Sequence, residues 1–175
     1  MSNTKQLRHA TAAELEILAQ FARLDISLDE LRERLVGMLE FDFQCRPGTG
    51  ELGGQSGGRF ERMIDPEGRT APGSTVQKLH NDGGELVAER RLTSYFLLPQ
   101  PGVRIELWHI RNAMGKQERG EISTRQLSDW AAMLLLNEAY DWEGPDEDEI
   151  AEWLNDISFL TLKPKAEPGV GPERL

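Results

Sequence analysis

The chain has few of the features that mark secreted or membrane proteins. It has a single cysteine, Cys45, so an intrachain disulfide is impossible. The longest apolar stretch, which includes Ala131 to Leu136, is far shorter than the about 20 residues that a transmembrane helix needs. The first residues lack the apolar run and small-residue cleavage site of a secretory signal. We therefore expect a cytoplasmic protein that does not bind membranes.

Basic residues are scarce in the C-terminal third. Residues 1–120 contain 16 Lys and Arg against 17 Asp and Glu, a net charge of −1, whereas residues 121–175 contain 4 against 13, a net charge of −9. Such a surface repels nucleic-acid phosphates and attracts basic proteins from a distance. We therefore expect no nucleic-acid partner.

Recognised metal and cofactor motifs are also lacking. The three histidines, His9, His80 and His109, are too far apart in sequence for a zinc motif. Residues 48–53 match the Gly-x-Gly-x-x-Gly pattern of dinucleotide sites, but more glycines follow where that site needs a helix. The acidic run near residue 146 lacks the glycine-containing spacing of a calcium loop. We expect no cofactor and no metal.

The composition is that of one folded domain. Of the 175 residues, 38% are apolar and 29% are charged, which is enough apolar material for one core. We predict a single globular domain over residues 1–162 and a flexible tail over 163–175, where three prolines and two glycines occur.

Two capping boxes predict a pair of N-terminal helices. Thr11 and Glu14 have the spacing in which a hydroxyl and a carboxylate cap a helix start reciprocally, and Ser27 and Glu30 repeat it. Apolar residues follow at helical spacing in both cases. The pattern predicts helices over 12–24 and 28–39.

The middle of the chain is rich in glycine. Residues 46–84 hold ten of the 17 glycines, which predicts a long irregular connection with poor intrinsic order. Short strands are expected at Phe41–Phe43 before it and at Phe60–Ile64 within it. Residues 86–111 alternate around two prolines and predict an antiparallel hairpin, although Trp108 to Met114 fits a strand or a helix equally well.

Two further helices are predicted near the C-terminus. Ser123 and Gln126 form another capping box before an apolar stripe that ends near Asn137, and a last helix begins at about Asp146. The segments 26–31 and 122–127 share the text Ile-Ser-x-x-[Glu/Gln]-Leu, which we interpret as convergence on one cap. The expected fold is α+β, with an N-terminal helix pair, a small antiparallel sheet around the 86–111 hairpin, and two C-terminal helices.

The strongest functional signal is acidic. Between Glu138 and Asp156 there are nine carboxylates and no Lys or Arg. A helix dipole stabilises carboxylates in its first turn, but it does not account for those that precede the helix. The surplus predicts a surface for a basic partner, with aromatic anchors. The predicted partner-binding residues are Glu138, Tyr140, Asp141, Trp142, Glu143, Asp146, Glu147, Asp148, Glu149 and Glu152.

The same region carries a family resemblance. The text Gly120-Glu-Ile-Ser123, followed by Leu127, Trp130 and Ala131, an acidic stretch and a second amphipathic helix, resembles small bacterial immunity-type proteins that neutralise toxins. The likeness covers about 40 residues. It implies a non-enzymatic inhibitor that binds a basic toxin domain, for which the acidic charge is suited.

Two other interpretations stay open at this point. One is an enzyme or small-ligand binder in which Cys45, His80 or His109, and the 46–84 connection form a site, since a thiolate needs a nearby base. The other is an acidic domain whose charge only keeps it soluble. The sequence does not indicate an oligomeric state.

Overall fold

The computed structural model describes residues 7–45, 58–63, 73–80, 86–97 and 102–159. In chain order the elements are α1 (Ala12–Ala22), α2 (Leu28–Arg34), β1 (Leu39–Cys45), β2 (Gly58–Met63), β3 (Gly73–His80), β4 (Leu86–Ser94), β5 (Val103–Arg104), α3 (Leu107–Glu118), α4 (Thr124–Leu136), β6 (Tyr140–Asp141) and α5 (Glu147–Ser158). The fold class is α+β, as the sequence predicted. Among these residues no helix is long and apolar enough to cross a bilayer.

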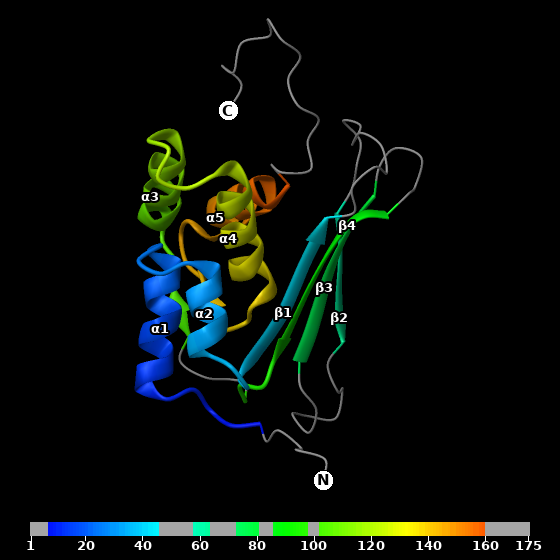
Figure 1. The fold of residues 1–175 in the computed structure, drawn as a ribbon. Coiled ribbons are helices and arrows are strands. Elements are labelled where there is room, and N and C mark those ends of the chain that lie inside the picture. The colour runs from blue at the N-terminus through cyan, green and yellow to red at the C-terminus, as the bar shows by residue number, and fades with distance from the viewer. Residues whose placement is uncertain (1–6, 46–57, 64–72, 81–85, 98–101, 160–175) are drawn as a thin grey trace, which may run out of the picture.

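A four-stranded antiparallel sheet forms one layer and the helices form the other. The strand order is β1-β4-β3-β2, and the helices all lie on one side of this sheet (Figure 1). Residues that alternate along β4 face opposite ways, so Arg90 and Leu92 are buried under the helices whereas Arg91 is exposed on the other face. The domain is therefore two layers around one core.

The core is centred on α4, which contributes more buried side chains than any other described element. Trp130 is 1% exposed, and its indole N–H donates to the carbonyl oxygen of Ala22 at 3.2 Å. Leu18 and Phe21 of α1, Leu39 of β1 and the apolar stripe of α5 belong to the same cluster. Helix α4 thus connects the N-terminal helices with the sheet and with α5.

All three predicted capping boxes are present. The hydroxyls of Thr11, Ser27 and Ser123 accept from the backbone N–H three residues on, and the side chains at those positions accept in return. The helix ends are less well predicted, because α1 stops at Ala22 and α2 stops at Arg34. A short helix followed by Gly37 at φ +87° lets the chain turn into β1 at Leu39, where a helix to residue 39 was predicted.

The predicted 86–111 hairpin is wrong. Strand β4 pairs with β1 and β3, whereas β5 pairs in parallel with β6. The Val103 N–H donates to the Ala139 carbonyl at 2.7 Å, and the Ile105 N–H donates to the Asp141 carbonyl at 2.8 Å. Residues from Leu107 form helix α3, so three helices rather than two follow the sheet. Local alternation predicted strands here but could not reveal pairing with residues almost 40 positions away.

Two parts of the glycine-rich connection form strands, and its other residues lie outside the described ones. Strand β2 confirms the expected strand near Phe60, but β3 was missed, and it occupies the sheet position between β2 and β4. Backbone pairing on both edges stabilises β3 despite a composition that suggested a loop. The predicted tail over 163–175 lies outside the described residues.

Candidate protein interface

The predicted partner-binding residues gather around the start of α5. Exposed carboxylates come from β6, from the connection after it and from the first turns of the helix. We call this surface the acidic face, and it consists of Asp141, Glu143, Asp146, Glu147, Asp148, Glu149 and Glu152.

Local structure explains part of this arrangement. Glu147, Asp148 and Glu149 occupy the first turn of α5, where carboxylates complement the helix dipole. An Oδ1 atom of Asp141 accepts from the Glu143 backbone N–H at 3.0 Å and shapes the connection. Asp146 is the N-cap, yet its side chain makes no capping hydrogen bond. Glu143 and Glu152 have no such structural role.

Positive side chains do not neutralise the acidic face. Within the described part of the chain, none of its seven carboxylates lies within 4 Å of a Lys or Arg nitrogen. Arg90 pairs with Asp129 at 3.2 Å, and Arg91 pairs with Glu89 at 3.1 Å. These two arginines therefore pair with carboxylates outside the acidic face, and its charge is not explained by internal ion pairs with them.

Three predicted contact residues are buried or partly buried. Tyr140 is 4% exposed, and its hydroxyl donates to the Leu18 carbonyl at 2.8 Å, so it cannot act as an anchor. Burial raises the pKa of this phenol well above its usual value. Glu138 is partly buried and interacts with other residues of the chain. Trp142 is half-buried and packs against the core.

Sequence reasoning missed the two most exposed indoles. Trp108 at the start of α3 is 45% exposed, and Trp153 of α5 is 39% exposed. The Trp108 indole stacks on His109 at 3.6 Å, and its N–H donates to the Glu106 carboxylate at 2.7 Å, which holds the ring in place. Nothing in the sequence marks this exposure, because Trp153 follows Ile150 at the spacing of an apolar helical stripe and Trp108 lies in a segment that fits a strand or a helix equally well.

A groove of about 310 Å³ opens beside the acidic face. One wall is the junction of β5 and α3, with Arg104, Trp108 and Arg111, and the other wall is the connection from β6 to α5, with Trp142 and Asp146. Acidic, basic and aromatic groups thus meet on one surface that combines β5, α3, β6 and α5.

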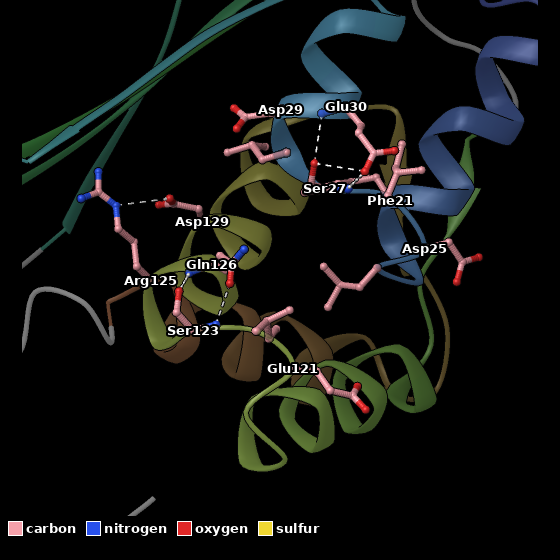
Figure 2. Close-up of a pocket in the computed structure, with 14 residues that line it drawn as sticks. Phe21, Asp25, Ser27, Asp29, Glu30, Glu121, Ser123, Arg125, Gln126 and Asp129 are labelled. Atoms are coloured by element: carbon pink, nitrogen blue, oxygen red, sulfur yellow. Dashed lines mark hydrogen bonds and ion pairs between the residues drawn. The ribbon is translucent and has the colours of Figure 1, made fainter.

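A second hollow lies between the N-termini of α2 and α4. It measures about 480 Å³, and the capping boxes Ser27–Glu30 and Ser123–Gln126 line its opposite sides (Figure 2). Its carboxylates are used within the chain: Glu30 in the cap, and Asp129 in pairs with Arg90 and Arg125. The shared sequence text therefore reflects two caps that face one hollow, and we assign no ligand to it.

For the alternative enzyme site, the structure describes the backbone positions of Cys45 and His80 and the full contacts of His109. Cys45 ends β1 and His80 ends β3, with β4 between these strands. His109 is buried in α3, where Nδ1 accepts the Glu106 backbone N–H at 2.9 Å and burial lowers the imidazole pKa. Its role is to cap a helix. Among the described residues no three metal-binding side chains lie together.

Comparisons with known proteins add no assignment. No protein-family model, no curated protein sequence and no solved structure matches this chain.

Proposed function

We propose that this chain is a non-enzymatic protein-binding module whose acidic face receives a basic partner. The observation that carries the proposal is the contrast in ion pairing. Eight carboxylates elsewhere in the described residues lie within 4 Å of an Arg or Lys, whereas the seven of the acidic face do not. Uncompensated charge at one place is costly for folding but favourable for association.

Exposed tryptophans provide apolar contact area, which the acidic side chains do not. Interfaces derive most of their binding energy from a few aromatic or arginine side chains surrounded by polar groups. Trp108 is held rigid by His109 and Glu106, so ordering it on binding costs little entropy. Trp153 lies three residues after Ile150 of the groove, which places both on the same side of α5.

The kind of partner follows from these features. A concentrated negative potential accelerates encounter with a positive protein and suppresses acidic competitors. This suits an immunity or inhibitor protein, which must capture a basic toxin domain quickly, and the resemblance at Gly120–Ala131 supports the same function. The proposed partner is therefore a basic protein, a toxin domain in particular.

The test is partner capture with charge-matched variants. The acidic-face variant carries Glu147→Gln, Glu149→Gln and Glu152→Gln. The control carries Glu16→Gln, Glu33→Gln and Glu118→Gln, three exposed positions outside that face. Proteins captured by the wild type are identified, and each prey is purified and titrated against all three forms.

The expected result is a basic prey that forms a defined complex with the wild type and the control but binds the acidic-face variant at least about tenfold more weakly, equivalent to about 1.4 kcal/mol. If every prey binds the two variants equally, the charge serves solubility alone and the proposal is wrong.

A further inference from the structure

The groove beside the acidic face contains two arginines that differ from the other arginines whose side chains the structure describes. Ten arginine side chains are described, and eight of them lie within 4 Å of a carboxylate. The two exceptions are Arg104 and Arg111, which make neither an ion pair nor a hydrogen bond within the described structure. Both line the same groove, although Glu106 and Asp146 also line it.

Both arginines are positioned by regular structure. Arg104 belongs to β5, which is held by its pairing with β6. Its Nη2 atom lies over Gly144, where an added Cβ would approach it to 2.7 Å, so the glycine makes room for the guanidinium. Arg111 follows Trp108 by three residues on α3, which places the two side chains on the same side of that helix.

This arrangement suits a carboxylate. A guanidinium presents planar paired donors that match the two oxygens of a carboxylate, and the adjacent indoles of Trp108 and Trp142 offer flat apolar surface to the rest of the residue that bears it. The groove balances two arginines against Glu106 and Asp146, and the acidic face lies beside it. A group with one negative charge is therefore favoured over a phosphate, which carries about two.

We propose that this groove binds a single carboxylate of the partner, an acidic side chain set among basic residues. The inference rests on the proposed function and sharpens it: the partner segment carries lysines or arginines for the acidic face and one central Asp or Glu for Arg104 and Arg111. Specificity among basic proteins then depends on this carboxylate. Any basic surface can bind the acidic face, but only a partner with a carboxylate at the right position can also bind the two arginines of the groove.

Two synthetic peptides test the inference. Each has five residues with blocked termini and four lysines, around a central glutamate in one and a central glutamine in the other. The glutamine peptide has the greater positive charge, so the acidic face alone would bind it more tightly. Binding is followed by titration of the ¹⁵N-labelled chain, with the indole N–H signals of Trp108 and Trp142 as local probes.

The expected result is that the wild type binds the glutamate peptide about fivefold more tightly than the glutamine peptide, the gain of a charge-assisted pair near the surface. The variant with Arg104→Gln and Arg111→Gln loses that preference or reverses it. The control with Arg91→Gln and Arg119→Gln, two ion-paired arginines elsewhere, retains it.

The outcomes separate this inference from the proposed function. If both peptides bind, weaken alike in the acidic-face variant and show no preference for glutamate, the groove does not bind a carboxylate while the acidic face still binds basic partners. If neither peptide binds at millimolar concentration, both the inference and the proposed recognition of basic segments are overturned.

Discussion

At the scale of single residues, the buried Arg90 joins the two layers. Its guanidinium donates to Gln77 Oε1 at 2.9 Å, to the Ser158 carbonyl at 2.6 Å and to Ser128 Oγ at 3.0 Å, and pairs with Asp129. These contacts connect β3 and β4 with α4 and the end of α5. Burial raises the Asp129 carboxyl pKa although the Arg90 charge opposes it.

Removal of this arginine is expected to destabilise the domain strongly. Arg90→Met removes one donor from each of these acceptors and the closer ion-pair partner of Asp129, and loss of one partner of a buried pair costs about 3–5 kcal/mol. Arg91→Met is the matched control, since that side chain lies on the open face and changes stability by no more than about 0.5 kcal/mol. Urea denaturation measures both values. If both variants lose the same free energy of unfolding, the hydrogen bonds of Arg90 do not stabilise the domain more than the surface pair of Arg91 does.

Glu14 makes stability depend on pH in the acid range. Two hydrogen bonds from the Arg8 guanidinium, at 2.7 and 2.8 Å, are the main reason that its pKa is lowered from 4.5 to about 2. Because the folded pKa is depressed, the stabilisation is present above pH 4.5 and is lost as the pH falls toward 2.

The variant Glu14→Gln is therefore expected to be less stable than the wild type at neutral pH, by up to about 1 kcal/mol for a pair of this exposure. Glutamine can still complete the capping box, so the charge alone is tested. The difference, measured by denaturation at a series of pH values, should vanish as the pH approaches 2. A difference that is constant with pH would mean that the ion pair is not its cause.

At the scale of elements, the caps of α2 and α4 are the most predictable features. Ser123→Ala removes an acceptor for the Gln126 N–H at 3.0 Å and is expected to lower the free energy of unfolding by about 1 kcal/mol. Ser123→Asp keeps an acceptor and should stay close to the wild type. Thermal and urea denaturation compare the two, and an alanine variant as stable as the aspartate variant would contradict the role of the cap.

What the sequence revealed at this scale was local. Capping residues and apolar periodicity lie within a few positions of each other, so α1, α2, α4 and α5 were predicted with their starts nearly correct. Pairing of β5 with β6 joins residues 37 positions apart, Val103 with Tyr140. Strand β3, in contrast, pairs with its sequence neighbours β2 and β4. No local pattern encodes the pairing of β5 with β6, which is why the hairpin was predicted wrongly. Strand β3 was missed because it lies within a glycine-rich segment whose composition is typical of loops.

In the candidate interface, too, local sequence features were predicted and features that depend on the fold were not. The acidic residues were evident because they are consecutive in sequence. The burial of Tyr140 was not, since it results from packing against Leu18, 122 positions away. The groove was also invisible, because Arg104 and Arg111 meet Trp142 and Asp146 only after β5 pairs with β6.

At the scale of the whole molecule, charge is distributed unevenly between the two layers. On the open face of the sheet, Asp42 lies opposite Arg91 and Glu89 lies opposite Lys78 in the register, so acidic and basic side chains are interleaved there. Around α5 they are not. A domain whose unpaired carboxylates gather at one helical end has a preferred direction of approach for a positive protein.

This imbalance predicts how stability responds to salt. The acidic face contributes mutual repulsion, so added sodium chloride should raise the free energy of unfolding of the wild type more than that of the variant with Glu147→Gln, Glu149→Gln and Glu152→Gln. Urea denaturation at several salt concentrations measures the two slopes. Identical slopes would show that these carboxylates do not repel each other appreciably.

The most direct test is the salt dependence of the complex with the captured basic partner. The dissociation constant, measured by titration across a series of salt concentrations, should rise steeply for the wild type and for the Glu16, Glu33 and Glu118 control, and much less for the acidic-face variant. A dissociation constant that does not change with salt, or that changes equally in all three proteins, would contradict the assignment of this surface to a basic partner.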